Sequence, residues 1–201
     1  MEPIVQLNSN AKLSEHFTLG EMTKSSSHPE VYNIPSHEAI ANLKRICTWL
    51  EVLRERYNER YNACHLERSR EISPRAALGR DDKGGGTLGM TTASVSSRLS
   101  EAHGEISEKP IIINSGYRSP LLNRKIGGVK NSNHLTGCAV DIRVTGMEQA
   151  KQYAEILREY ADESHQDFDE LLIEKNRYGA IWLHFAVRPR ENRRKVAFIR
   201  A

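Results

Sequence analysis

The feature that most constrains the fold of this chain is a long segment, residues 63–107, in which no hydrophobic period of a helix or a strand persists. Glycine and serine are frequent there, as in Gly84-Gly85-Gly86 and Ser96-Ser97, and large apolar side chains are sparse. Such a segment cannot bury enough apolar surface to offset the entropy that it loses on ordering. A hydrophobic core must therefore come from the residues before and after it.

The beginning of this segment, residues 64–74, resembles translated interspersed DNA repeats. A structureless loop of such length is also uncommon inside a compact domain. We therefore interpret residues 63–107 as a disordered insertion into a single domain that spans residues 1–201, and an ordinary mobile loop is the alternative. Without the segment, the chain has the usual length of one domain.

Composition excludes several classes of function. The chain has 29 Lys and Arg residues against 26 Asp and Glu residues. The net charge of +3 lies in no long basic block, which argues against a nucleic-acid partner. No apolar run approaches the ~18 residues of a membrane span. The three cysteines, at positions 47, 64 and 138, are far apart, which excludes a zinc site made of cysteines.

Apolar periodicity predicts two helices and several strands. A helix is expected over residues 36–60, where apolar residues recur at three- and four-residue steps, and a second helix is expected after a capping box at residues 145–148. Runs rich in β-branched and aromatic residues predict strands at 111–113, 139–144, 168–175, 181–187 and 196–199. Because strands and helices do not alternate regularly, we expect an α+β fold with an antiparallel sheet.

Three residues in the strand-rich half are candidate metal ligands. His134 and Asp141 are separated by six residues that include Gly137, and His184 lies on a later strand. On that strand, alternation places His184 on the face opposite to the fully apolar one. Two histidines and one carboxylate are a common ligand set for zinc, with a fourth position left for water. A surface pair is the alternative for the first two residues, and a hydrogen-bonded histidine is the alternative for the third.

Several motifs around these residues form a recognisable set. They are Ser-Gly-Tyr-Arg-Ser-Pro at residues 115–120, the pattern S-x-H-x-x-G-x-A-x-D at residues 132–141, and W-x-H at residues 182–184. The set resembles the zinc D-alanyl-D-alanine carboxypeptidase family, murein peptidases that share a fold with the hedgehog signalling domain. The resemblance includes an opening segment at residues 13–22, and it covers residues 12–61 and 109–187.

The resemblance implies a hedgehog/DD-peptidase-like fold, in which helices pack on a sheet and a cleft binds one Zn²⁺ ion. The metal ligands that it implies are His134, Asp141 and His184. The substrate-binding residues that it implies are Tyr117, Arg118, Ser132 and Trp182. Arg118, which is also a catalytic candidate, would bind a carboxylate of the substrate, a role that fits the bidentate chemistry of a guanidinium. Ser132 would orient the metal loop or contact the substrate.

The general base is where the chain departs from the family. One branch has a glutamate three residues before the last histidine ligand, and Ile181 stands there in this chain. Another branch has a histidine two residues before that ligand, where this chain has Trp182. Glu174, on the preceding strand, is the remaining catalytic candidate, because a carboxylate near the metal could move a proton from water to the leaving amine. A surface acid paired with a neighbouring cation is the alternative for Glu174.

The resemblance implies zinc-dependent hydrolysis of a peptide bond in the stem peptides of peptidoglycan, by a D-Ala-D-Ala carboxypeptidase or a related murein endopeptidase. Two alternatives remain: a non-catalytic, zinc-containing module that binds the cell wall, and a copy inactivated by the insertion. The amino terminus lacks the basic and apolar regions of a secretory signal. This predicts a cytoplasmic protein that is released to act on the cell wall, as phage or prophage lysis enzymes are.

Overall fold

The structure is a computed structural model, and it describes residues 9–25, 27–71 and 108–200. Most of the predicted insertion therefore lies outside the described residues. The chain divides into two compact parts, one made of Met1–Tyr57 with Pro110–Ala201 and the other of Asn58–Lys109. The sheet and all the predicted site residues belong to the first part.

Within the second part, the side chain of Asn58 binds the backbone of Lys109. The N–H of Lys109 donates to Oδ1 at 2.6 Å, and Nδ2 of Asn58 donates to the carbonyl oxygen of Lys109 at 3.2 Å. These two bonds join the ends of this part of the chain. The arrangement fits an insertion between them, which stays a prediction.

The described residues form four α-helices and one short 3₁₀ helix. They are α1 (Leu19–Thr23), α2 (His37–Glu71), α3 (Pro120–Lys125), η1 (Asn133–Thr136) and α4 (Met147–Ser164). The prediction that the second of these ends near residue 60 is wrong, because α2 continues to Glu71. The added residues include Ala63, Leu66 and Glu67, which are good helix formers, so propensity extends the helix after its apolar period has ended. None of the helices in these ranges is long and apolar enough to cross a membrane.

Five strands form one sheet in the order β1-β2-β4-β3-β5. The strands are β1 (Ile113–Ser115), β2 (Ala139–Arg143), β3 (Glu170–Lys175), β4 (Ile181–Ala186) and β5 (Lys195–Arg200). The pairs β1–β2, β2–β4 and β4–β3 are antiparallel. The predicted α+β class is therefore confirmed, and β3 and β4 form an antiparallel hairpin.

The prediction of a wholly antiparallel sheet is wrong for β5, which pairs with β3 in parallel. β4 already has β2 and β3 as neighbours, so it offers no free edge to the next strand. The N–H groups of Arg194 and Lys195 donate to the carbonyl oxygens of Phe168 and Asp169, at 2.9 and 3.0 Å. The chain therefore returns to the start of β3, and β5 extends the sheet at the free edge of that strand.

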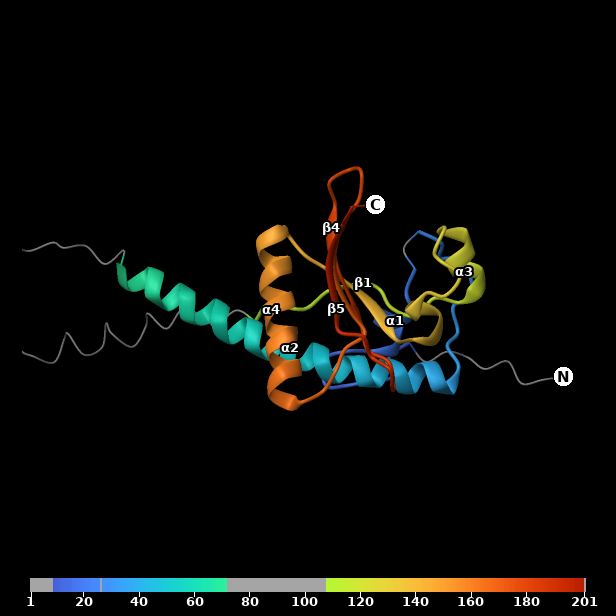
Figure 1. Ribbon diagram of the computed structural model, residues 1–201, viewed down its shortest axis with the longest axis horizontal. Coiled ribbons are helices and arrows are strands. Elements are labelled where there is room, and N and C mark those ends of the chain that lie inside the picture. The colour runs from blue at the N-terminus through green and yellow to red at the C-terminus, as the bar shows by residue number, and fades with distance from the viewer. Residues whose placement is uncertain (1–8, 26, 72–107, 201) are drawn as a thin grey trace, which may run out of the picture. The chain divides into compact units, whose positions relative to one another are not determined.

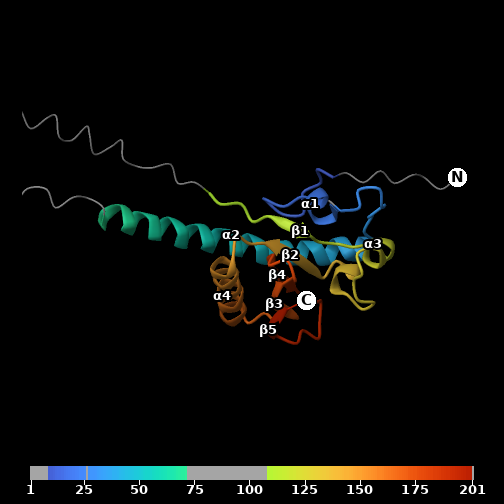
Figure 2. The ribbon, with the colours of Figure 1, turned by 90° about the horizontal axis from the view of Figure 1, so that it is seen from above.

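One face of the sheet carries the hydrophobic core. Leu183 and Phe185 of β4 lie on this face and are fully buried. Trp49 of α2 contacts Phe185 and also Tyr160 of α4, with ring centroids 5.4 and 4.8 Å apart. Figures 1 and 2 show α4 lying across α2 beside the strands. The other face of β4, where His184 lies, is left for a site, as predicted.

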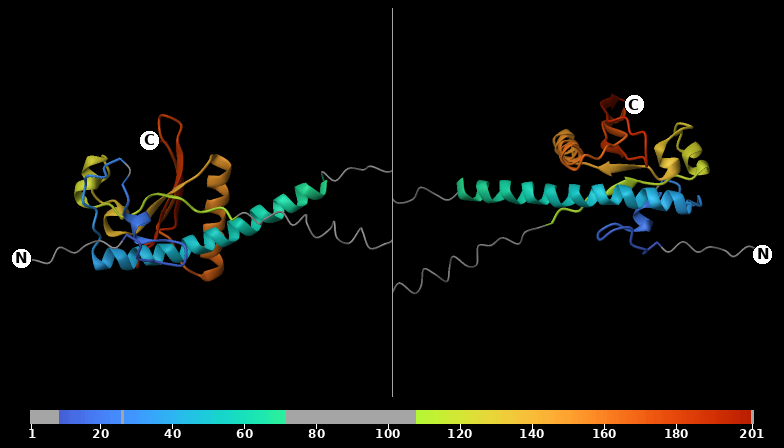
Figure 3. Two further views of the ribbon diagram at one scale, coloured as in Figure 1. Left: turned by 180° about the vertical axis from the view of Figure 1, so that it is seen from behind. Right: turned by 60° about the horizontal axis from the view of Figure 1, so that its bottom comes forward.

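The turn-rich stretch between β1 and β2 contains two short helices that the sequence pattern did not predict. Ser119 caps α3 by accepting a hydrogen bond from the N–H of Leu122 at 3.3 Å, and Pro120 takes the first helical position, where no N–H is needed. Ser132 caps η1 in a similar way. Figures 1 and 3 show the strands between α3 on one side and α4 on the other.

Several predicted starts differ from the structure, and β3, expected from residue 168, begins at Glu170. β1 begins at Ile113, two residues later than expected, and Ile112 before it is 43% exposed. The predicted capping box of Thr145 and Glu148 does not form, since Gly146 is the N-cap and no side chain caps it. Instead Oε1 of Gln149, one position further along the helix, accepts a hydrogen bond from the N–H of Thr145 at 2.7 Å.

Gly137 ends η1 in the left-handed region, with φ of 71°, and an added Cβ would lie 2.5 Å from the backbone oxygen of Ala39. We expect Gly137→Ala to lower the free energy of unfolding more than Gly127→Ala, a glycine with φ of 73° and no atom within 4 Å of such a Cβ. The left-handed backbone costs ~1–2 kcal/mol in both variants. The clash with α2 is added only at Gly137. Urea denaturation measures both losses, and equal losses would mean that α2 moves aside without cost.

Candidate metal centre

His134, Asp141 and His184 come together on the face of the sheet opposite to the core. One donor atom of each lies within 4.8 Å of the others. Asp141 and His184 are direct partners in the register of β2 and β4, and His134 reaches them from η1. The three residues are 2, 7 and 8% exposed, so the group is buried. The structure therefore brings the three predicted ligands into one cluster.

The position of His134 is fixed from outside the cluster. Its Nδ1 lies 2.6 Å from the carbonyl oxygen of Gly116. Only an N–H can bond a carbonyl oxygen, so Nδ1 carries the proton and Nε2 keeps its lone pair. Nε2 faces Asp141, at 3.3 Å from Oδ1. Burial lowers the pKa of His134, which keeps the ring in the neutral form that binds metals.

Asp141 joins the three other charged or ionisable groups of the cluster. Its Oδ1 lies 2.9 Å from Nδ1 of His184, and its Oδ2 accepts a hydrogen bond from Arg118. Burial alone would raise the pKa of Asp141, but His134 and His184 beside it hold this pKa well below its usual range. The carboxylate is therefore ionised, as a metal ligand must be.

The ring of His184 lies between two carboxylates. Nδ1 faces Asp141, and Nε2 lies 3.7 Å from Oε2 of Glu170. Burial alone would lower the pKa of His184, but the hydrogen bond with Asp141 and the nearby charge of Glu170 raise it to about 9. In the metal-free chain, a proton must therefore leave this ring when a metal binds.

Two glutamates of β3 share the face of His184, and their surroundings differ. Glu174 pairs in register with Trp182 and is half-buried. Burial raises the pKa of Glu174, although the charge of His184 opposes the shift. Contacts with His184 and Lys195 hold the pKa of Glu170 at about 2. Glu174 is therefore the acid suited to proton transfer, and Glu170 is the acid that stays charged.

Arg118 and Ser132 both contact the cluster or the loop that carries it. Arg118 binds Asp141 and donates through Nε to Oγ of Ser115 at 2.8 Å. Its backbone N–H also donates to the carbonyl oxygen of His134 at 3.0 Å. Ser132 accepts a long hydrogen bond, 3.4 Å, from the N–H of His134. Ser132 thus contacts the loop that carries His134, and its role in orienting that loop or binding the substrate stays a prediction.

Trp182 and Tyr117 lie in different surroundings. Trp182 is on the site face of the sheet and is the register partner of Glu174. Tyr117 belongs to the hydrophobic core cluster and is 8% exposed. That position fits packing in the core better than contact with a substrate. A tyrosine occurs both in cores and in binding sites, so its residue type did not indicate which of the two it occupies.

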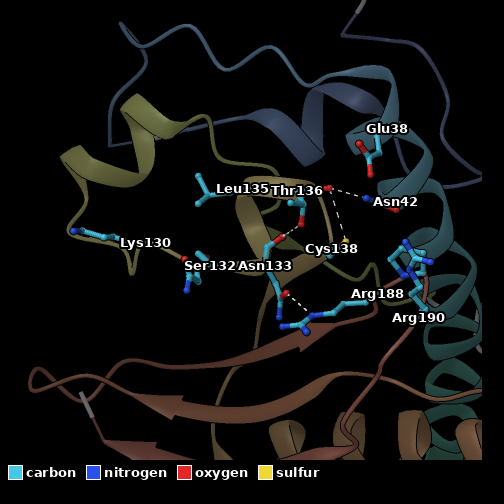
Figure 4. A pocket seen from close by; sticks show the side chains of 12 residues that line it. Glu38, Asn42, Lys130, Ser132, Asn133, Leu135, Thr136, Cys138, Arg188 and Arg190 are labelled. Carbon is cyan, nitrogen blue, oxygen red and sulfur yellow. Dashed lines mark hydrogen bonds between the residues drawn. The ribbon is translucent and has the colours of Figure 1, made fainter.

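Sequence reasoning missed Asn133 and Glu170, which meet beside the cluster. Nδ2 of Asn133 donates to Oδ2 of Asp169 at 2.8 Å and to Oε2 of Glu170 at 3.2 Å. Its Oδ1 accepts a hydrogen bond from Nε of Arg188 at 3.0 Å. Figure 4 shows Asn133 and Arg188 meeting in the wall of a cavity of about 460 Å³, which none of the three ligands lines. The sequence did contain one signal that could have identified Glu170. Side chains alternate along a strand, which places Glu170 on the same face of β3 as Glu174.

Asp169, the acid next to Glu170 in the chain, is unsuited to act as a general base because of its contacts. The side chain is fully buried, and Arg193 donates two hydrogen bonds to it, at 2.7 and 2.8 Å. Although burial alone would raise the pKa of Asp169, the bonds from Arg193 and Asn133 lower it. These hydrogen bonds connect Asp169, which directly precedes β3, to Arg193, which lies just before β5.

The donor set of the cluster fits zinc. Two imidazole nitrogens and one carboxylate oxygen are typical of catalytic zinc sites, which keep a fourth position for water or substrate. The bond from His134 to the Gly116 carbonyl is the outer contact that metal-ligating histidines usually make. The cluster therefore has both the ligands and the support that a zinc ion requires.

Comparison with known proteins agrees with this geometry. The family model described as Peptidase M15 matches residues 82–175, a range that includes Arg118, His134, Asp141 and Glu174 and ends before β4. The zinc D-Ala-D-Ala carboxypeptidase of Streptomyces albus G is 33% identical to the chain over 66 residues. These are 30% of this chain and 26% of the relative, so the chain spans about a quarter of the relative's length.

The fold, the cluster and the family match lead to one assignment. An α+β sheet with a His-Asp-His group is the hedgehog/DD-peptidase fold of this family, which depends on zinc. The predicted cofactor, one zinc ion, is thereby confirmed. These comparisons support the predicted relationship of the chain to the zinc D-Ala-D-Ala carboxypeptidases of the peptidase M15 family.

Proposed function

We propose that the chain hydrolyses a peptide bond in the stem peptides of peptidoglycan, as a D-Ala-D-Ala carboxypeptidase or a related murein endopeptidase. The proposal extends to this chain the substrate in the name of the Streptomyces albus G relative. The observation that carries it is Glu174, an acid of raised pKa within electrostatic reach of His184 and Asp141. A non-catalytic zinc module would have no need of such an acid.

His134, Asp141 and His184 would hold the zinc ion. When bound, zinc polarises the scissile carbonyl and lowers the pKa of a water molecule to ~7. The Gly116 carbonyl orients His134, and Arg118 orients Asp141, in the chain without metal. Two of the three ligands are therefore held in place before the metal arrives, which favours a precise site.

Glu174 would move the proton of the reaction. Its carboxylate takes a proton from the attacking water as the new C–O bond forms. It then gives this proton to the amine nitrogen as the C–N bond breaks. Because burial raises its pKa, the group can both accept and release a proton closer to neutral pH than an exposed glutamate can.

Arg118 would position the substrate. A guanidinium has five N–H donors, and here Nε binds Ser115 while one terminal nitrogen binds Asp141. Among the described residues, no further acceptor is found for the other N–H groups, and the side chain is 15% exposed. These groups suit a carboxylate of the stem peptide.

Incubation of the zinc-loaded chain with purified murein fragments, read by mass, tests the proposal. Loss of one alanine would indicate a carboxypeptidase, and a cut inside the stem would indicate an endopeptidase. His134→Ala is the control, since it lacks a ligand and should give no product. If the zinc-loaded wild-type chain also gives no product, the enzymatic proposal fails. Sedimentation with insoluble peptidoglycan would then test the binding module.

A further inference from the structure

Glu170 lies beside the ring nitrogen of His184 that points away from Asp141. Nδ1 of His184 faces Asp141 at 2.9 Å, whereas Nε2 faces Oε2 of Glu170 at 3.7 Å. The second distance is that of an ion pair rather than of a hydrogen bond. One ring nitrogen therefore points to the metal cluster, and the other points to a carboxylate outside it.

Glu170 is itself held from two sides. Its Oε1 lies 3.0 Å from a terminal nitrogen of Arg193 and accepts a hydrogen bond from Nζ of Lys195 at 3.2 Å. Its Oε2 accepts a hydrogen bond from Asn133 at 3.2 Å. The two cations bind one oxygen, so the other oxygen is left to Asn133 and His184. The Glu170 side chain is 16% exposed, which limits competition from water.

Asn133 connects this carboxylate to the loop of the other histidine ligand. It directly precedes His134, and its amide group is fully used by Asp169, Glu170 and Arg188. Figure 4 shows the contact between Asn133 and Arg188. A single amide therefore joins the loop of His134 to the strand that lies beside His184.

We propose that Glu170 is a positioning residue for His184, and that Asn133 couples it to His134. A carboxylate beside the outer nitrogen of a histidine favours a proton on that nitrogen and leaves the lone pair on the inner one. Glu170 thus directs Nδ1 of His184 toward Asp141 and the metal. The proposal rests on zinc binding at this site and does not depend on the proposed hydrolysis.

Zinc affinity of the full chain, measured by competition with a chromophoric chelator, tests this role. Glu170→Ala is expected to weaken zinc binding by about 10–100-fold, as loss of outer-shell partners does. Glu170→Gln keeps an oxygen that can face Nε2 and should recover part of the loss. Glu163→Gln, which changes an exposed acid paired with Arg56, is the matched control and should bind zinc as the wild type does.

A second measurement separates positioning from general stability. The absorption spectrum of the cobalt-substituted chain reports the geometry of the ligands, and it should change in Glu170→Ala. If both Glu170 variants bind zinc within twofold of the wild type, or if only their melting temperature falls, the proposal is wrong. If murein fragments are not cleaved but Glu170→Ala still weakens zinc binding, the positioning role stands and the proposed reaction falls.

Discussion

Glu174→Gln is expected to lower kcat for the cleaved stem peptide by about 10²–10⁴-fold, the range that general acid–base groups contribute. Glutamine keeps the size of the side chain beside Trp182 but cannot accept a proton from water. Zinc content should stay at the wild-type value, because Glu174 is outside the group of His134, Asp141 and His184. Steady-state kinetics and metal analysis of the same samples measure both quantities.

The same substitution should change the pH profile. Burial raises the pKa of Glu174 above the usual value of 4.5. A general base must be ionised, so kcat/KM of the wild type should fall as the pH drops through this raised pKa and recover above it. In Glu174→Gln this decrease of kcat/KM at low pH (the acid limb of the profile) should be missing from the residual activity. A variant that keeps wild-type kcat, or keeps the limb, would assign the proton transfer to another group.

The two glutamates of β3 offer an internal comparison. They lie four residues apart on one face of the strand, yet one has a raised pKa and the other a pKa of about 2. Glu174→Gln should lower kcat in a chain that still holds zinc. Glu170→Gln should instead lower the affinity for zinc. A pair of variants with the same phenotype would contradict the division of roles between the two carboxylates.

Much of the site could be predicted because its signals are local. Alternation along β4 separates His184 from Leu183 and Phe185, and the structure shows that separation. The β-branched residues after Gly137 predict a strand, and β2 follows that pattern. Short-range patterns of this kind need no knowledge of the partner elements.

The parts that could not be predicted depend on contacts between distant residues. The bonds from Asn133 to Asp169 and Glu170 join positions 36 and 37 residues apart, and no periodicity encodes them. β5 joins β3 in parallel because β4 has no free edge, a fact about the sheet and not about β5. α2 passes its predicted end because helix propensity persists after amphipathicity stops.

His134→Ala is expected to weaken zinc binding by roughly 60- to 700-fold. Structural zinc sites gain about 10–16 kcal/mol from four ligands, which is roughly 2.5–4 kcal/mol for each, and each ~1.4 kcal/mol is a factor of ten. The remaining ligands, Asp141 and His184, would still bind each other at 2.9 Å, so the pocket should persist with poor affinity. Competition with a chelator measures the loss, and hydrolysis of the stem peptide should vanish with it.

Thermal unfolding gives an independent reading of the same prediction. A ligand that binds only the folded chain at 100 times its Kd stabilises it by ~2.7 kcal/mol, so added zinc should raise the melting temperature of the wild type. His134→Ala should lose this increase. His37→Ala, at an exposed position that begins α2, should keep it. If zinc stabilises His134→Ala as much as the wild type, the ion binds elsewhere and the cluster of His134, Asp141 and His184 is not the metal site.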